Sequence, residues 1–377
     1  MTFDSAFTAA PSSANRVTDT APERYFNAVL DAFARAAATS HTSERCCTIA
    51  GALFRLCYAG RAVERLTFPA LAHLETGAEG ADDDESFTVY LWDSAATDVP
   101  LPAIPWDFAA DRCTRDYGTQ GEIRGYNNAR FGALHHQWYE QLTLIDRQRR
   151  IGIVWFADAA AQPYWERAFP LRPLLHLWSR DTDVQLLHAA AVGTPRGGAL
   201  LIGVSGTGKS STALSCVPDH DQPPGLRLAG DDYTAVRIDA AAPTVYSLYN
   251  IAKLNADNIG RFPHMARWIS NPDRLDTEKA MLSLYDHAPD ALIGSFPLKA
   301  ILLPRITGAA RTQITPARPF EALWAAAPTT IFQLIGAKAH TLHKLTALVR
   351  CAPVYTLALG ADRYEIPDAI STFLEDL

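Results

Sequence analysis

The stretch that decides the fold of this chain is "LIGVSGTGKSST", residues 201–212. Apolar residues lead into three glycines, then a lysine and two serines, which is typical of a strand that ends in a loop and continues as a helix. Residues 203–210 match the pattern G-x-x-x-x-G-K-[ST] at every fixed position. A tight turn alone would need fewer glycines. We therefore predict a loop whose backbone N–H groups surround a phosphate at the start of the helix.

Each fixed position of this loop has a predicted role. The glycines permit a backbone path that a Cβ atom would obstruct, Lys209 brings a positive charge to the β- and γ-phosphates, and the Ser210 hydroxyl can ligate Mg²⁺. A glycine-rich turn beside an ordinary surface lysine is the alternative interpretation. The residues predicted to bind the nucleotide are Gly203, Ser205, Gly206, Thr207, Gly208, Lys209, Ser210 and Ser211.

Two adjacent aspartates provide acidic groups that can work with this loop. The segment "LRLAGDDYTAV" (226–236) places Asp231 and Asp232 22 and 23 residues after Lys209, and one helix, a loop and a returning strand fit this separation. Because neighbouring side chains on extended backbone point in opposite directions, one carboxylate can hold a metal ion while the other accepts a proton. "GDD" is also a good turn sequence, so a plain turn is the alternative.

Length and composition predict a soluble, cytoplasmic protein of two domains. The 377 residues exceed the size at which one core keeps growing, and 48% hydrophobic with 20% charged residues support a folded chain. A net charge of −7 argues against nucleic acid as a partner. No apolar run is long enough to span a membrane, no secretory signal is visible, and the six cysteines, which lack a CxxC pair, predict reduced thiols.

The apolar pattern divides the chain into three predicted segments. Residues 1–20 are rich in small polar residues and are expected to form a flexible tail. Residues 21–180 mix helix and strand patterns, which predicts a smaller α+β domain of unknown role, and residues 181–377 predict an α/β domain. Within these segments we expect a helix over 164–180 split by Pro170 and Pro173, strands over 184–192, 197–204, 225–238 and 298–306, and helices over 320–327 and 337–350.

Three stretches in this order carry a resemblance to a known family: "LHAAAV" (187–192), "GALLIGVSGTGKSSTAL" (198–214) and "LAGDDYTAV" (228–236). They resemble the C-terminal catalytic domain of HPr kinase/phosphorylase, whose nucleotide-binding core is related to phosphoenolpyruvate (PEP) carboxykinase. The resemblance covers about residues 184–377. It implies an α/β fold with a PEP-carboxykinase-like P-loop kinase core and a mixed sheet, and an ATP-dependent kinase that phosphorylates a serine hydroxyl of a peptide or protein.

The resemblance also implies roles for individual residues. By motif position, Lys209 holds the phosphates, Ser210 and Asp231 serve Mg²⁺, and Asp232 is the general base for the acceptor hydroxyl. His188 matches the histidine that opens the family's core, and would orient the aspartate or the acceptor. Taken alone, a histidine in an apolar strand is more often structural.

The chain departs from HPr kinase/phosphorylase proper after the paired aspartates. That family carries there a glycine-containing signature with a glutamate, whereas "SLYNIAKLNADNIGRF" (247–262) has none, and the next glutamate is Glu278. A true bifunctional HPr kinase/phosphorylase is therefore not expected, and the sequence leaves open whether reverse phosphorolysis occurs. The chain is more similar to divergent relatives, including those that phosphorylate a serine of lasso-peptide precursors. Lys253 and Lys279 fall where such relatives have basic residues near the nucleotide, although an ordinary surface lysine is the commoner interpretation of each.

Two other functions stay open at this point: a nucleotide-dependent ATPase or switch without a dedicated acceptor, and a kinase of free serine or a related small alcohol. The sequence also leaves open the oligomeric state. The domain over 21–180 is hypothesised to recognise the acceptor or to mediate assembly.

Overall fold

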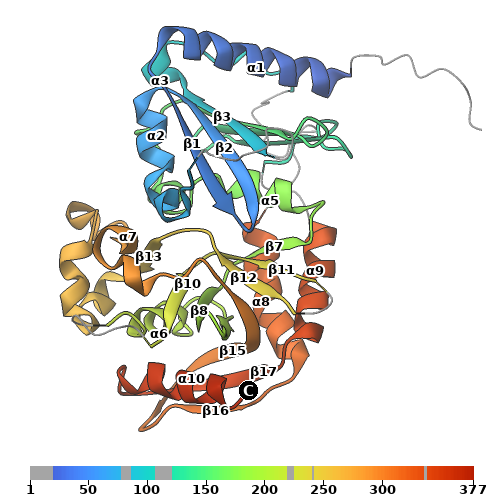
Figure 1. Ribbon diagram of the computed structural model, residues 1–377. Helices are drawn as coiled ribbons and strands as arrows, with labels where there is room; N and C mark the ends of the chain where they lie inside the picture. The colour runs from blue at the N-terminus through green and yellow to red at the C-terminus, as the bar shows by residue number, and fades with distance from the viewer. Residues whose placement is uncertain (1–19, 78–85, 107–120, 219–224, 240–241, 335–337) are drawn as a thin grey trace, which may run out of the picture.

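The structure, a computed structural model, describes residues 20–77, 86–106, 121–218, 225–239, 242–334 and 338–377. The predicted tail therefore lies outside the described residues, apart from Thr20, which caps helix α1 (Ala21–Thr39) by accepting a hydrogen bond from the Glu23 amide. The described ranges form a mixed α/β fold with two large sheets, one above the other in Figure 1, which confirms the predicted α/β class. None of the helices found there is both long and apolar enough to cross a bilayer.

The first sheet belongs to the N-terminal half. Its strands are β1 (Thr42–Ile49), β2 (Ala52–Ala59), β3 (Phe87–Asp93), β4 (Phe131–His136), β5 (Gln141–Asp146) and β6 (Ile151–Phe156), accompanied by helices α2 (Arg61–Thr67) and α3 (Ser94–Thr97). They follow the order β1-β2-β3-β6-β5-β4, parallel from β2 through β3 to β6 and antiparallel elsewhere. Helix α1 covers one face, where its Phe26 joins a core cluster with Trp92 and Leu144. The upper part of Figure 1 shows this arrangement.

The second sheet carries the phosphate-loop motif. Its strands are β7 (Val184–Leu187), β8 (Ala190–Thr194), β9 (Gly197–Leu201), β10 (Arg227–Gly230), β11 (Thr234–Arg237), β12 (Thr244–Ser247), β15 (Ser295–Ala309), β16 (Gln313–Pro316) and β17 (Val354–Gly360). They follow the order β10-β8-β9-β15-β12-β11-β7, with β17 beside β15 and β16 beside β17. Both faces of β9 are buried, which explains its continuous apolar run.

Helices cover both faces of this second sheet, which is thus the middle of three layers. They are α6 (Lys209–Ser215), α8 (Pro319–Gln333), α9 (Lys338–Cys351) and α10 (Glu365–Glu375). Ala322 of α8 and Leu345 of α9 pack in the cluster that contains Leu200, whereas Ala213 of α6 and Ile370 of α10 pack in the cluster on the opposite face. Smaller elements lie beside the sheet. They are the strands β13 (Ile251–Leu254) and β14 (Ala280–Ser283), which pair with each other, α7 (Leu284–His287), and 3-10 helices over Ala256–Arg261, Pro263–Trp268, Pro272–Arg274 and Pro289–Ala291.

Two predicted strands are each divided in two, and both divisions fall on predicted site residues. The stretch 184–192 breaks at 188–189, between β7 and β8, and the stretch 225–238 breaks at 231–233, between β10 and β11. The cause is a change of partner, because β7 pairs with β11 whereas β8 pairs with β10. The prediction of single strands was wrong because both sides of each break are apolar, so the hydrophobic pattern does not reveal the exchange.

The strand register brings these breaks to the end of β9. Ala190, at the start of β8, lies opposite Leu201, the last residue of β9. Its neighbour Ala191 lies opposite Gly230, the last residue of β10. The phosphate loop, the histidine before β8 and the aspartates after β10 therefore leave the sheet at one edge.

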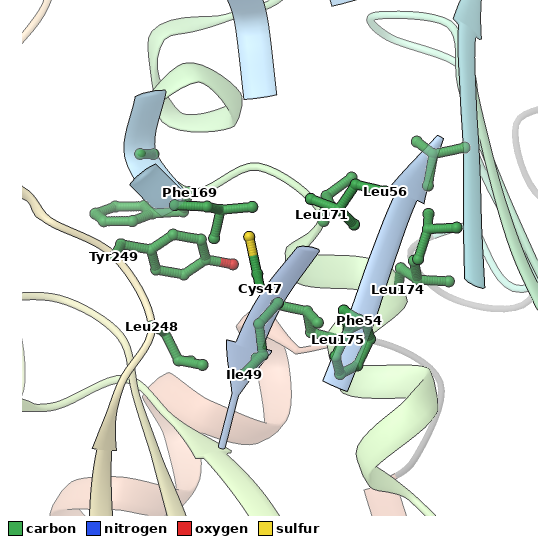
Figure 2. Packing of buried hydrophobic residues seen from close by; sticks show 14 of the residues in the cluster. Cys47, Ile49, Phe54, Leu56, Phe169, Leu171, Leu174, Leu175, Leu248 and Tyr249 are labelled. Atoms are coloured by element: carbon green, nitrogen blue, oxygen red, sulfur yellow. The ribbon is translucent and has the colours of Figure 1, made fainter. Parts of the chain in front are cut away.

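Helices α4 (Tyr164–Ala168) and α5 (Arg172–Ser179) lie between the two sheets. Their separation at 169–171 confirms the predicted split beside Pro170. Leu174 of α5 belongs to one core cluster together with Phe54 of β2 and Tyr249, which follows β12 (Figure 2). The Tyr249 hydroxyl also donates to the backbone oxygen of Pro170 at 2.9 Å. Residues on either side of position 180, where we placed the boundary, thus share a core.

Candidate active site

The loop between β9 and α6 owes its course to two glycines. β9 ends at Leu201, three residues before the predicted end of this strand, because the chain turns into the loop there. Gly206 has a φ of 85° and Gly208 a φ of 102°, in the region that favours glycine. A Cβ atom at Gly208 would lie 2.6 Å from Cδ1 of Leu359 on β17. The loop is therefore shaped by glycine conformation at both positions, and by contact with the sheet at the second.

Lys209 turns back toward its own loop. The side chain is buried, and its Nζ donates to the backbone oxygens of Gly203 at 2.7 Å and Val204 at 3.2 Å. Burial lowers the pKa of Lys209, and the carboxylates of Asp232 and Asp231 act in the opposite direction. An ammonium group has three N–H donors, so one is left for a ligand.

Asp231 is buried in the break between β10 and β11. Its Oδ2 accepts a hydrogen bond from the Lys253 amide at 2.9 Å. Burial and the neighbouring Asp232 carboxylate raise the pKa of Asp231 to about 6, whereas the Lys253 amide and the Ser210 hydroxyl lower it. Its Oδ1 has no hydrogen bond of ordinary geometry. A buried carboxylate oxygen without a donor, beside a serine hydroxyl, is a suitable ligand for a hard cation.

Asp232 is held on both of its oxygens. Oδ1 lies 3.0 Å from Nε2 of His188, and Oδ2 lies 2.7 Å from Nζ of Lys253. Burial acts to raise the pKa of Asp232, but the contacts with His188 and Lys253 outweigh it and hold this pKa well below its ordinary value. The antiparallel pairing of Leu187 with Thr234 places the two breaks together and so brings His188 to Asp232. The carboxylate is ionised and fixed in orientation at neutral pH.

Tyr233 connects this site with the segment before residue 180. Its hydroxyl accepts a hydrogen bond from Nη1 of Arg172 at 3.0 Å and donates to Oε1 of Gln333 at 2.8 Å. Arg172 also forms a buried ion pair with Glu166, with Nη2 and Oε1 3.0 Å apart. The wall of the site beside Tyr233 thus depends on helices α4 and α5.

Most of these groups line one cavity with a volume of about 300 Å³. Of the predicted site residues, the cavity lining includes His188, Ser205, Gly206, Gly208, Lys209, Ser210, Ser211 and Asp232, but not Gly203, Thr207 and Asp231. The rest of the lining includes Lys253 and Lys279, which the resemblance had placed near the nucleotide. The sequence did not identify the other lining residues, which are Arg172, Tyr233, Leu254, Asn255, Asn258, Arg261, Ile306 and Gln333. Five of the lining residues are lysines or arginines and one is an aspartate, which favours a polyanionic ligand.

Lys253 and Lys279 are better placed than ordinary surface lysines. Lys253 lies on β13 and Lys279 directly precedes β14, so both reach the cavity from the same strand pair. Glu278, the glutamate nearest to the position of the family signature, does not line the cavity. Its Oε2 is bound instead by Arg167 at 2.8 Å and by Asn271 at 3.1 Å. The resemblance predicted a position near the nucleotide for both Lys253 and Lys279, and both line the cavity.

The region around Ser210 and Asp231 fits Mg²⁺. Within the described ranges, no group of three or more His, Cys, Asp or Glu side chains could hold a metal ion. Mg²⁺ does not need such a group, because it usually binds one or two protein oxygens and completes its shell with water and phosphate oxygens. The Ser210 hydroxyl and Oδ1 of Asp231 are two neighbouring oxygens of this kind.

Comparison with known proteins adds little to this geometry. No family model matches the chain, and no curated protein matches it. Among solved structures, the Hpr(Ser) kinase/phosphatase from Coxiella burnetii is similar over 51% of this chain and 95% of its own, at 11% identity and a TM-score of 0.27. A likeness of this size does not decide function.

Proposed function

We propose that this protein is an ATP-dependent kinase that transfers the γ-phosphoryl group to a serine hydroxyl of a peptide or protein. The observation that carries the proposal is that Lys209 of the phosphate loop and the histidine-bound carboxylate of Asp232 line one cavity. The loop by itself would support nucleotide binding only. An ionised, oriented carboxylate beside it supplies a group that can take a proton from an acceptor.

The proposed reaction assigns one task to each group. Asp232 takes the proton of the serine hydroxyl as the bond between Oγ and the γ-phosphorus forms. The bond between that phosphorus and the bridging oxygen breaks, and ADP leaves. Lys209 neutralises charge on the β- and γ-phosphates, and His188 holds the Asp232 carboxylate in place. Phosphoryl transfer needs little covalent chemistry from the protein, so positioning and charge neutralisation supply most of the rate.

Ser210 and Asp231 hold Mg²⁺ in this proposal. When bound, the ion neutralises phosphate charge and orients the triphosphate. Asp231 suits this task because its Oδ2 is already fixed by the Lys253 amide while its Oδ1, near the Ser210 hydroxyl, has no hydrogen bond of ordinary geometry. We further propose that the core is of the PEP-carboxykinase-like type found in HPr-kinase-like enzymes. Lasso-peptide precursors belong to the proposed class of acceptor.

The test follows label from [γ-³²P]ATP, in the presence of Mg²⁺, into synthetic peptides with a single serine and, in parallel, into free L-serine. We expect the wild-type protein to label peptide. Asp232→Asn should lower the transfer rate by about 10²- to 10⁴-fold, the usual contribution of a general base, and leave nucleotide affinity unchanged by calorimetry. Lys209→Met should instead weaken nucleotide affinity by about 10- to 100-fold, because a charge-assisted hydrogen bond contributes about 1.5–3 kcal/mol.

Each of the other outcomes has a definite meaning. Label on free serine but on no peptide would show a small-molecule kinase. Bound nucleotide or free phosphate without a labelled acceptor would show a nucleotide-dependent switch. Transfer that is undiminished in Asp232→Asn would remove Asp232 as the base and overturn the proposed mechanism.

A further inference from the structure

Lys253 is tightly enclosed for a lysine that lines a charged cavity. Its side chain is 12% exposed, and its Nζ lies 2.7 Å from Oδ2 of Asp232. The same Nζ lies 4.5 Å from the ring centroid of Phe169 and 5.7 Å from that of Tyr164. An aromatic ring attracts a cation over its face, and the attraction grows when water is excluded. One carboxylate and two aromatic rings therefore hold this ammonium group.

The backbone of Lys253 is fixed as well. Its amide donates to Oδ2 of Asp231 at 2.9 Å, and its strand pairs with β14. A lysine anchored at both ends of its side chain gives Asp232 a donor on Oδ2 in a set place. His188 supplies the donor on Oδ1. Because the two donors hold different oxygens, together they fix the plane of the Asp232 carboxylate.

We propose that Lys253 is a positioning residue for Asp232, and that Phe169 and Tyr164 act through Lys253. This inference rests on the proposed function, since it assigns the supports of the proposed base. Phe169 and Tyr164 both precede residue 180. The N-terminal part of the chain therefore supplies part of the transfer site itself, in addition to any role in recognising an acceptor.

A competing role for Lys253 is direct binding of phosphate, because it lines the same cavity as Lys209. The two roles predict different kinetics. A positioning residue changes the rate of transfer at saturation, whereas a phosphate ligand changes nucleotide affinity. Substitution of Lys253 thus separates them.

The experiment measures kcat, acceptor KM and nucleotide Kd for Lys253→Met. We expect kcat to fall by about 10- to 100-fold, as misplacement of a reacting group by about 1 Å does, with KM and Kd nearly unchanged. Lys253→Arg keeps the charge and a donor, and should restore part of the lost kcat. Lys279→Met is the matched control, because Lys279 lines the same cavity and pairs with no acidic side chain of the described residues. It should weaken nucleotide affinity, and its effect on kcat should be smaller than that of Lys253→Met.

A double-mutant cycle tests the aromatic part. Phe169→Leu should lower kcat when Lys253 is present and add no further loss in Lys253→Met, because its effect passes through the ammonium group. A purely structural role of this buried ring would give the same loss in both backgrounds. Thermal unfolding of every variant identifies those that are not folded, and Lys253→Gln, which also removes the charge, then serves in place of Lys253→Met.

Three results would overturn the inference. Lys253→Met with kcat intact and nucleotide affinity reduced would make Lys253 a phosphate ligand. Additive losses with Phe169→Leu would remove the aromatic rings from the argument. Both results leave the proposed kinase standing, provided that the wild-type protein labels its acceptor. A wild-type protein that labels no acceptor would overturn the proposed function, and this inference with it.

Discussion

Replacement of Gly208 by alanine tests how the phosphate loop is built. Gly208 adopts a φ of 102°, and an added Cβ would lie 2.6 Å from Cδ1 of Leu359, a side chain that is 6% exposed. Gly206 is a matched control in the same loop. Its φ of 85° is also positive, but an added Cβ would have no other atom within 4 Å. The two substitutions therefore share the conformational cost and differ in the steric one.

The magnitudes follow from these contacts. A left-handed conformation costs a residue with a Cβ about 1–2 kcal/mol. Overpacking by one carbon in a filled core costs about 1–3 kcal/mol more. We expect Gly208→Ala to lower the free energy of unfolding by about 2–5 kcal/mol and Gly206→Ala by about 1–2 kcal/mol. The first value is a large fraction of the total stability of an ordinary protein, about 5–15 kcal/mol.

Urea-induced unfolding of the two glycine variants, of Leu359→Val and of the two double variants measures this difference. Leu359→Val removes the atom that the new Cβ would meet, so the double variant Gly208→Ala/Leu359→Val should recover the steric part, as a coupling of about 1–3 kcal/mol. The same valine combined with Gly206→Ala should show no coupling. Equal losses for the two glycine variants, or a coupling of zero at position 208, would refute the idea that contact with β17 shapes the loop.

Two further predictions concern buried charges. Arg172→Met leaves Glu166 buried without its ion-pair partner and should lower the free energy of unfolding in urea by about 3–5 kcal/mol. Adding Glu166→Gln in a double variant should restore most of this loss. An Arg172→Met variant as stable as the wild type would contradict the ion pair. Burial lowers the pKa of His176 to about 3, below the ordinary value of 6.5. Its neutral form therefore contributes stability that is fully present above pH 6.5 and is lost as the pH falls toward 3. The free energy of unfolding of His176→Leu should therefore fall less steeply than that of the wild type below pH 6.5, by about 1.4 kcal/mol per pH unit. Plots of unfolding free energy against pH that run parallel for the two proteins would contradict this prediction.

The sequence predicted the part of the site that is local. The order of apolar run, glycine-rich loop and helix is contained in 201–212, because each element depends on residues within a few positions of one another. The glycines at 206 and 208 show why, since both are needed for the loop's own backbone angles. The split beside Pro170 was predictable for the same reason, as proline acts on its own turn of helix.

The sequence did not predict the contacts that depend on tertiary packing. Arg172 and Tyr233 are 61 residues apart, and no periodicity relates them. The sequence favoured a surface position for Lys253, because lysines are usually exposed. In the structure, a carboxylate and two aromatic rings offset the cost of its burial. The exchange of strand partners was missed as well, because an apolar pattern reports which residues are buried and not against which strand.

The exchange of partners, rather than the loop motif, decides whether the proposed site assembles. Gly230 lies opposite Ala191, and Ala190 lies opposite Leu201, so the ends of β10 and β9 meet at the start of β8. A slip of one residue between β8 and β10 would turn every side chain of the slipped strand to the other face. The aspartates would then leave the edge at which the loop begins, although the loop itself would keep its sequence and its glycines. A chain can therefore carry the full phosphate-loop motif and bind nucleotide without the paired carboxylates. The strand register around positions 188 and 231–233 is the feature that would distinguish a kinase of the proposed kind from a simple nucleotide-binding protein.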